Sequence, residues 1–377
     1  MNANQTGKKN SGRTWKKALG IVLIVLFILY WILVYFLVSA ALVPSFMRKL
    51  DAFEEITKKS YGEMVQTEDI KQNQKKALSV MDQWLENVVR EKQILYSEDG
   101  YRLAAMEFRQ DQQPAAVPAE AGTVAGSDAQ PAIAEAGTAA GSDAQPTAPG
   151  GSSHNWVILL HGYTGWKEEM YPFAFWYFTE KGYNVLAPDL RCQGWSDGDF
   201  IGMGYTDRAD VLLWIGHILE IDPQARIILH GQSMGAACAL MMTGLEELPD
   251  CVKAVVADCA YTDAYSMFRV KIGDWFHLPA FPLVDSACLM LKLRGGYDLK
   301  KASALEAVKV SETPTLFIHG TEDAMISVSM SEEMYAACAA PKELLLVPGA
   351  GHVQSQDKDP DAYYGAVADF LAAWNPE

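Results

Sequence analysis

Six short apolar runs between residues 156 and 347 place the strongest limit on what this chain can fold into. None of them alternates apolar with polar residues, which is the pattern of strands buried on both faces of a parallel sheet. Helical patterns separate most of them, and this alternation is typical of α/β proteins with helices on both sides of the sheet. The runs are WVILL (156–160), YNVLA (183–187), RIILH (226–230), KAVVA (253–257), PTLFI (314–318) and ELLLV (343–347).

Two further strand-like runs precede these six. QILYS (93–97) and YRLAAMEF (101–108) flank the pair Asp99-Gly100, which favours a tight hairpin turn. The sequence therefore predicts an eight-stranded sheet that is antiparallel at its start and parallel afterwards.

Residues 18–43 form a run of 26 residues without a charged side chain. As a helix this run reaches about 39 Å, which exceeds the hydrocarbon core of a bilayer. A signal peptide is the alternative, since Val38, Ser39 and Ala40 resemble a cleavage site, but a secretory apolar region usually has only about 7–15 residues. We therefore interpret residues 18–43 as one uncleaved transmembrane helix that contacts the lipid bilayer.

Residues 1–17 carry five basic side chains and no acidic one. Basic segments beside a membrane span tend to stay on the cytoplasmic side. We expect a basic cytoplasmic tail over 1–17, a single-pass protein of the cell membrane, and a chain whose bulk lies outside the cytoplasm.

Two segments interrupt the path from the span to the six runs. Residues 44–92 are predicted to form a stalk region whose helix carries one apolar face and docks on the following domain, with binding of a partner as the alternative. Within 111–153, the segment AEAGTVAGSDAQP (119–131) recurs with one substitution at 134–146. Its composition is that of a flexible linker, so we interpret it as a surface loop inserted in the domain.

The segment HGQSMGA places Gly231, Ser233 and Gly235 in a G-x-S-x-G pattern between a strand and a helix. The turn in such a nucleophile elbow is so tight that larger residues at the two glycines would collide with the neighbouring backbone. The serine then projects at the helix N-terminus, where unpaired N–H groups favour negative charge. We predict that Ser233 is a nucleophile.

A serine nucleophile needs a base, and the base needs an acid that orients it. Of the three histidines after Ser233, only His352 leaves the loop after residue 318 available for an acid between nucleophile and base, in contrast to His277 and His319. The loop after residue 318 offers Glu322 and Asp323 as this acid, while Asp258, at the end of the preceding strand, is a rival. We predict Asp323 and His352 as catalytic residues.

Stabilisation of an oxyanion needs two backbone donors close to the nucleophile. The N–H of Met234, directly after the serine, and the N–H of Tyr163, in the Gly162 loop after the first parallel strand, are the candidates. His161 lies in the same loop, and we interpret it as a hydrogen-bonded structural residue.

Charge and motif content argue against several functions. Beyond residue 17 the chain has 26 basic and 47 acidic residues, so phosphate backbones would repel it and nucleic acid is not an expected partner. The seven histidines and six cysteines lack the spacings of a metal site, and no dinucleotide or phosphate-binding loop accompanies the motifs. We expect neither metal nor organic cofactor, and mostly buried thiols.

The segments HGYTG, DLRCQGWSDG, GQSMGA, HGTED and GAGH stand in the order and spacing of the α/β-hydrolase superfamily. Over roughly residues 93–375 the chain resembles bacterial membrane-anchored hydrolases of the serine-aminopeptidase-like and monoglyceride-lipase-like type. Cys192, Gln193 and Gln232 depart from the residues that many relatives have there, which leaves the substrate open.

The resemblance implies an α/β-hydrolase domain over 93–377, with a small helical cap over 261–309 that covers the site, and a serine-hydrolase mechanism. Our leading hypothesis is a membrane-tethered hydrolase that cleaves a small-molecule carboxylic ester through an acyl-enzyme. Peptidase or amidase chemistry uses the same residues, and a non-catalytic surface binding protein is a hypothesis of another class. The sequence leaves the oligomeric state open.

Overall fold

The fold was analysed in a computed structural model that describes residues 8–47, 67–113 and 153–375. The duplicated segment predicted as a linker, the first residues of the basic tail and much of the predicted stalk lie outside the described residues. All six cysteines lie within them, and none of the six is paired in a disulfide.

An eight-stranded sheet forms the centre of the molecule, with strand order β1-β2-β4-β3-β5-β6-β7-β8. β1 and β2 are antiparallel to each other, β2 is antiparallel to β4, and all remaining neighbours are parallel. The strands are β1 (Glu91–Tyr96), β2 (Arg102–Phe108), β3 (Asn155–Leu160), β4 (Asn184–Pro188), β5 (Arg226–Gln232), β6 (Val252–Asp258), β7 (Thr315–Gly320) and β8 (Lys342–Val347).

This architecture confirms the predicted strands and their directions. Each of the eight runs identified in the sequence becomes a strand, with ends that differ from the prediction by no more than a few residues. The interior strands β3 to β7 are almost wholly buried, as their unbroken apolar patterns indicate.

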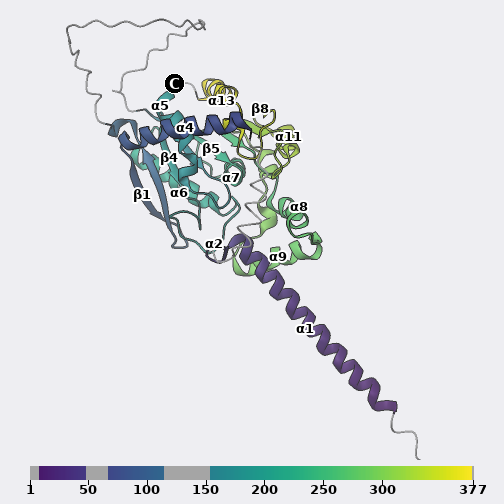
Figure 1. The fold of residues 1–377 in the computed structure, drawn as a ribbon. Helices are drawn as coiled ribbons and strands as arrows, with labels where there is room; N and C mark the ends of the chain where they lie inside the picture. The colour runs from purple at the N-terminus through teal and green to yellow at the C-terminus, as the bar shows by residue number, and fades with distance from the viewer. Residues whose placement is uncertain (1–7, 48–66, 114–152, 376–377) are drawn as a thin grey trace, which may run out of the picture.

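Helices cover both faces of the sheet (Figure 1). One apolar core holds α5 (Tyr171–Glu180) and α13 (Pro360–Trp374) against one face, and a second core holds α6 (Asp207–Ile221) and α7 (Met234–Met242) against the other. The second core also includes α11 (Val328–Ala337) and α10 (Ala304–Val308). Short elements complete the domain: η1 (Gln110–Gln112), η2 (Lys167–Met170), η3 (Leu299–Lys301) and α12 (Ser355–Lys358).

A helical pair, α8 (Ala264–Phe276) and α9 (Ala280–Arg294), occupies most of the segment between β6 and β7 that was predicted as a cap. Asp263 caps the start of α8, because its side chain accepts the backbone N–H of Ser266 at 2.7 Å. The buried side chains of α9, among them Leu283 and Leu291, belong to the same apolar core as α7. The pair is therefore packed onto the domain.

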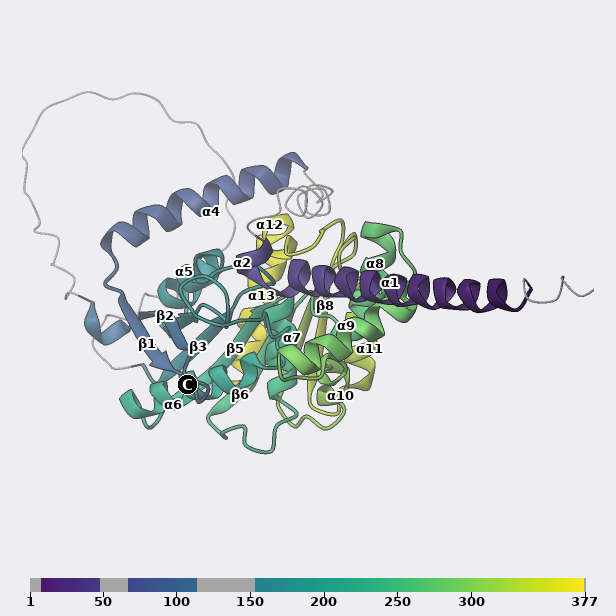
Figure 2. The ribbon, with the colours of Figure 1, turned by 90° about the horizontal axis from the view of Figure 1, so that it is seen from below.

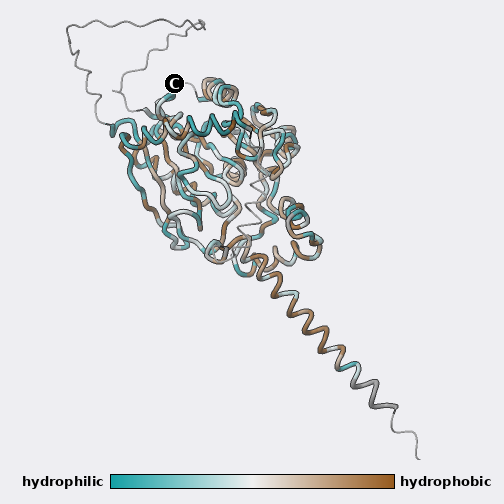
Figure 3. The backbone as a smooth tube through the Cα atoms, viewed as in Figure 1, coloured by the Kyte–Doolittle hydropathy of each residue, from teal (hydrophilic) through white to brown (hydrophobic). Residues whose placement is uncertain are grey.

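Helix α1 (Lys8–Leu42) projects away from the domain, and the short α2 (Pro44–Met47) follows it (Figures 1 and 3). Its part Trp15–Leu42 is long and apolar enough to cross a membrane. Large apolar side chains such as Ile21 and Phe27 are each 64% exposed, whereas Val34 and Val38 are buried against the domain. Only the C-terminal turns of α1 thus pack on protein.

Helix α4 (Glu68–Asn87) lies across the outside of the domain (Figure 2). Met81 is buried in the core under α5, and the ring of Trp84 stacks on Phe108 with 5.1 Å between the ring centroids. Two further apolar residues of this segment, Leu78 in α4 and Val89 just after it, are instead 50% and 36% exposed. Trp84 makes the contact with the domain instead, because its ring lies on the face of α4 that meets β2 and α5.

Candidate active site

Ser233 lies at the junction of β5 and α7 in a conformation that few non-glycine residues adopt, with φ 54° and ψ −115°. Both neighbouring glycines are needed for this turn. A Cβ on Gly231 would lie 2.3 Å from the backbone of Gly235, and a Cβ on Gly235 would lie 2.0 Å from the carbonyl oxygen of Leu160. The close approach of strand, turn and helix therefore explains the G-x-S-x-G spacing.

Ser233, His352 and Asp323 form one chain of hydrogen bonds. The Oγ of Ser233 lies 3.0 Å from Nε2 of His352, and Nδ1 of His352 lies 2.7 Å from Oδ2 of Asp323. The side chains of Asp323 and His352 are 0% and 4% exposed, and Ser233 is 8% exposed. The structure thus brings together the three residues that the sequence predicts as nucleophile, base and acid.

The carboxylate of Asp323 has a partner for each oxygen. Oδ1 accepts the backbone N–H groups of Met325 and Ile326, both at 2.8 Å, and Oδ2 lies 3.2 Å from Nε2 of His319 as well as beside His352. Burial alone would raise the pKa of Asp323, but the hydrogen bonds of His319 and His352 to it hold that pKa well below its usual range. Asp323 is therefore an anion that faces the imidazole of His352.

The rival acids occupy other environments. Asp258 is buried, and its Oδ2 accepts hydrogen bonds from Gln232 at 3.0 Å and Tyr363 at 3.4 Å, with no bond to His352. Burial raises the pKa of Asp258 to about 6. Its backbone carbonyl accepts the N–H of Ser233 at 2.8 Å, so Asp258 holds the elbow through its main chain. Glu322 is exposed.

The other histidines are held away from the serine. His161 accepts the N–H of Leu190 on Nε2 at 2.9 Å, and its Nδ1 lies 2.8 Å from the carbonyl of Gly162. His319 is fully buried between Ser331 and the acid loop, and His277 ends α8 in a left-handed conformation. The sequence-based interpretation of His161 as a structural residue agrees with these contacts.

The predicted oxyanion donors flank the nucleophile. Met234 is the first residue of α7, whose first N–H groups have no acceptor within the helix. On the other side, the position of a Cβ on Gly162 lies 3.6 Å from Cβ of Ser233, so the loop that carries Tyr163 passes directly beside the serine. The two N–H groups thus come from two segments that adjoin Ser233.

Ser233 and His352 open into a cavity of about 310 Å³. Part of its wall comes from α4, through Gln74, Ala77 and Leu78, which sequence reasoning did not assign to the site. Gln74 donates to Oδ2 of Asp357 at 2.7 Å, and Asn73 donates to the backbone carbonyl of the same residue at 2.8 Å. The sequence signal of this role was indirect, because it predicted only that this helix docks on the following domain.

The three departures from the family pattern have different surroundings. Gln232 joins two residues near the cavity, because its amide lies 3.0 Å from Asp258 and 3.3 Å from Gln356. The thiol of Cys192 lies 3.1 Å from the carbonyl oxygen of Gly198. Gln193 is buried, and no hydrogen-bond partner of its side-chain amide is found among the described residues.

Among the described residues, one group could hold a metal ion. It consists of Cys259, Asp323 and His352, whose ligand atoms lie within 4.8 Å of one another. Both ring nitrogens of His352 already face hydrogen-bond partners. Burial raises the pKa of the Cys259 thiol far above its usual value, which disfavours the thiolate that binds metals. The geometry favours the hydrogen-bonded arrangement over a metal centre.

A mostly parallel eight-stranded sheet with a serine elbow after β5 and a histidine after β8 defines a class of protein, the α/β hydrolases. The sequence agrees with this class, because residues 157–366 match the model of the Alpha/beta hydrolase family. This match spans more than half of the chain, which therefore belongs to that family, and the predicted fold is confirmed.

Two bacterial relatives lack an established function of their own. The uncharacterized protein YqkD of Bacillus subtilis is 30% identical over 223 residues, which cover 59% of this chain and 72% of the relative. The uncharacterized protein YfhR of Escherichia coli K12 is 28% identical over 236 residues, covering 61% and 75%.

Solved structures share the fold at low identity. The Pyrococcus furiosus esterase Pf2001 has a TM-score of 0.54 at 19% identity and covers 76% of this chain and 93% of its own. The acylaminoacyl peptidase of Pyrococcus horikoshii has a TM-score of 0.50 at 19% identity, covering 78% of this chain and 43% of its own.

Proposed function

We propose that this chain is a membrane-anchored serine hydrolase that cleaves a carboxylic ester through an acyl-enzyme intermediate. Ser233 is the nucleophile, His352 the general base and Asp323 the orienting acid. The observation that carries the proposal is the continuous hydrogen-bond chain from Ser233 Oγ through His352 to Asp323. Membership of the Alpha/beta hydrolase family and the likeness to an esterase structure support it further.

In the acylation step, Oγ of Ser233 attacks the carbonyl carbon of the ester while its proton passes to Nε2 of His352. The carbonyl oxygen takes up negative charge and accepts hydrogen bonds from the N–H groups of Tyr163 and Met234. Collapse of this intermediate breaks the bond to the alcohol oxygen, which leaves with the proton from His352. Asp323 stabilises the imidazolium that exists between the two proton transfers.

Deacylation repeats these steps with water. His352 removes a proton from the water as its oxygen attacks the acyl carbon, and the bond to Oγ of Ser233 then breaks. The proton returns to Oγ, so the free enzyme and a carboxylic acid result.

Helix α1 is proposed as the membrane anchor, with the hydrolase domain outside the cytoplasm. Its exposed apolar side chains support the role of an anchor. The basic residues that precede them support this orientation. Fusion of alkaline phosphatase to the C-terminus should give an enzyme that is active in intact cells, because that reporter folds only outside the cytoplasm. Fluorescence of a C-terminal green fluorescent protein fusion without phosphatase activity would reverse the orientation.

Labelling of the purified full-length protein with a fluorophosphonate tests the serine mechanism. We expect labelling of the parent protein, and Ser233→Ala should abolish it and lower ester turnover by on the order of 10⁴-fold or more. The exposed Ser327 offers a matched control, Ser327→Ala, which should change neither. Equal labelling of Ser233→Ala would disprove the assignment of Ser233 as the nucleophile. An unlabelled parent protein would favour a non-catalytic binding function.

Peptide or amide cleavage is the second candidate, favoured by the carboxylates that line the cavity. Glu169 and Asp357 lie on its wall, and no lysine or arginine lines it among the described residues. Burial raises the pKa of Asp357 to about 6 and that of Glu169 to about 7. Near neutral pH Asp357 is therefore mostly ionised and gives this wall a negative charge that attracts a cationic amino group. Turnover of p-nitrophenyl esters beside aminoacyl p-nitroanilides separates the two candidates, since a peptidase would prefer the anilides.

A further inference from the structure

The length of α1 sets the level at which a bilayer would end. Trp15 and Tyr35 are separated by 20 helical steps, about 30 Å, which equals the thickness of a bilayer's hydrocarbon core. Both residues are of the type that gathers at membrane interfaces, and Lys16 and Lys17 adjoin the first of them. The turns of α1 after Tyr35 therefore rise out of the bilayer and meet the domain.

Helix α9 packs beside α1 near Tyr35, where α1 leaves the bilayer. Near its middle, the hydroxyl of Ser286 lies 2.6 Å from that of Tyr30, one turn and more below Tyr35. At its end, Arg294 donates to Oγ of Ser39 at 3.2 Å and its guanidinium lies 4.3 Å from the ring centroid of Tyr35. Helix α9 therefore runs beside the last turns of α1, with Arg294 next to Tyr35 at the expected interface.

The outer side of α9 combines large exposed apolar side chains with charged ones, among them Asp285, which pairs with Lys300 at 2.8 Å, and Lys292, whose side chain is 60% exposed. Phe281, Leu289 and Leu293 of α9 are 74%, 49% and 77% exposed. A soluble domain gains nothing from such side chains, whereas beside a membrane span they continue the apolar surface of α1.

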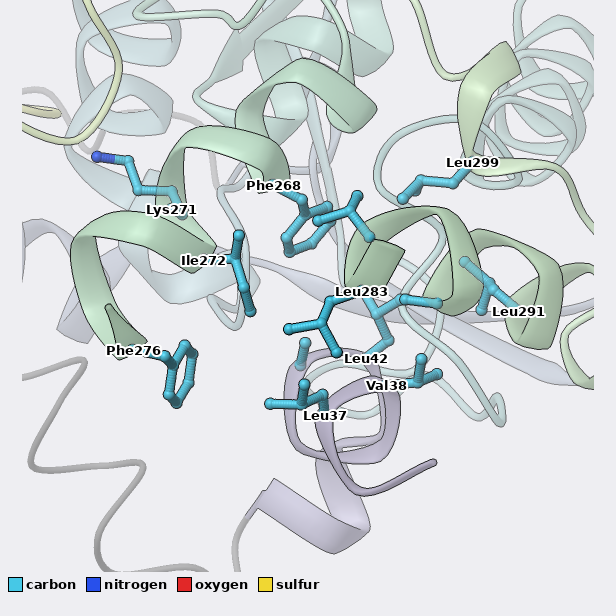
Figure 4. A pocket seen from close by; sticks show the side chains of 13 residues that line it. Leu37, Val38, Leu42, Phe268, Lys271, Ile272, Phe276, Leu283, Leu291 and Leu299 are labelled. Atoms are coloured by element: carbon cyan, nitrogen blue, oxygen red, sulfur yellow. The ribbon is translucent and has the colours of Figure 1, made fainter. Parts of the chain in front are cut away.

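Above this level, α1 and the cap enclose an apolar groove (Figure 4). The groove has a volume of about 70 Å³, enough for the end of a hydrocarbon chain but not for a whole lipid. The amine of Lys271, the one charged residue in the lining, points away from the apolar side chains. The lining comes from α1 (Leu37, Val38, Ala41, Leu42), α8 (Phe268, Lys271, Ile272, Phe276), α9 (Leu283, Val284, Ala287, Leu291) and Leu299.

Two contacts join this groove to the loops of the catalytic site. The hydroxyl of Tyr163 donates to the carbonyl oxygen of Ala41, so one residue reaches both the groove wall and the cavity of Ser233. The amine of Lys271 donates to the carbonyl of Ala324 at 3.2 Å, directly after Asp323. The oxyanion loop and the acid loop therefore both border the groove.

We propose that the end of α1 and the cap helices α8 and α9 form a binding site for the hydrocarbon chain of a bilayer-resident lipid ester. The hydrocarbon chain of the lipid passes from the bilayer past the exposed apolar side chains of α9 into the groove, while its ester group reaches Ser233. This proposal rests on the hydrolase function proposed above. It makes the membrane-spanning helix a wall of the substrate site as well as an anchor.

Narrowing the groove tests the proposal. Ala287→Phe fills the groove from α9, and Val310→Phe adds a ring on an exposed surface outside the groove as the control. In full-length protein in phosphatidylcholine nanodiscs, Ala287→Phe should lower kcat/KM for p-nitrophenyl palmitate at least about tenfold and that for p-nitrophenyl butyrate less than about twofold. Equal loss on both esters, or no loss on palmitate, would overturn the proposal.

A binding measurement keeps this test separate from that of the hydrolase function. Nanodiscs that contain phosphatidylcholine with a diazirine on its acyl chain are irradiated with the Ser233→Ala protein, and the modified peptides are identified by mass spectrometry. Crosslinks in 37–42 and 283–291 that disappear in the Ser233→Ala, Ala287→Phe double variant support the groove even if no ester is cleaved. An enzyme active on palmitate without crosslinks there would reject the groove and leave the hydrolase function standing.

Discussion

Two buried aspartates, Asp258 after β6 and Asp323 after β7, end neighbouring parallel strands and differ sharply in their environments. Asp323 accepts two backbone N–H groups and faces two histidines, and its pKa lies well below the usual range. Asp258 accepts side-chain bonds on one oxygen only, its other oxygen lacks a partner among the described residues, and burial raises its pKa to about 6.

The difference teaches that burial alone does not make a catalytic acid. Both carboxyl groups lose their contact with water, but the hydrogen bonds to Asp323 lower its pKa, whereas those to Asp258 leave its pKa raised. The loop geometry after β7 supplies those bonds, because two successive N–H groups there point at one carboxylate oxygen.

The largest effect is expected from Asp323→Asn. The amide cannot hold the charge that His352 needs when it takes the serine proton, and it favours the wrong tautomer of the imidazole. We expect kcat to fall by about 10⁴-fold with a folded protein, as is typical of the orienting acid in such triads. Steady-state kinetics together with circular dichroism checks this, and a loss below about tenfold would return Asp258 to consideration.

A smaller effect is expected from His319→Gln. His319 acts as a positioning residue, since its Nε2 lies 3.2 Å from Oδ2 of Asp323 and its Nδ1 lies 2.7 Å from Oγ of Ser331. We expect kcat to fall by roughly 10–100-fold while KM stays unchanged, because an acid held less firmly orients His352 less well. Ser331→Ala, which removes only the outer partner, should lose less, and a change confined to KM or to stability would contradict the positioning role.

The smallest effect is expected from Asp258→Asn, which should retain activity within about tenfold. The Asp258→Asn variant should instead differ from the parent protein in how its stability depends on pH. Between about pH 4 and pH 6 the unfolded chain releases the Asp258 proton and the folded protein keeps it, so stability falls as pH rises through this window. The asparagine variant lacks this loss of stability. The difference between its melting temperature and that of the parent should therefore increase from pH 4 to pH 6 and stay constant above pH 6.

Thermal melting in detergent across this pH range makes the measurement, with Asp250→Asn as the control on an exposed aspartate next to β6. A constant difference between parent and variant at every pH would mean that Asp258 is ionised throughout, and the contrast with Asp323 would then disappear.

Local patterns in the sequence were sufficient for much of the fold and for the nucleophile. The six parallel strands could be predicted from their unbroken apolar runs, and β1 and β2 from the two strand-like runs that flank the Asp99-Gly100 turn. Ser233 could be predicted because the tight turn excludes side chains at Gly231 and Gly235, a requirement that acts within five consecutive residues. His352 followed from chain order once the nucleophile was assigned.

The sequence by itself thus determined the strands, the elbow and the apolar span, all of which depend on neighbours in the chain. Only the tertiary structure decided that Asp323 rather than Asp258 faces His352, that α4 lines the catalytic cavity and that α1 closes a groove with the cap. These arrangements join segments up to hundreds of residues apart, as Tyr30 and Ser286 show. No local pattern encodes them, because hydrogen-bond partners and cavity walls depend on how separate elements pack in space.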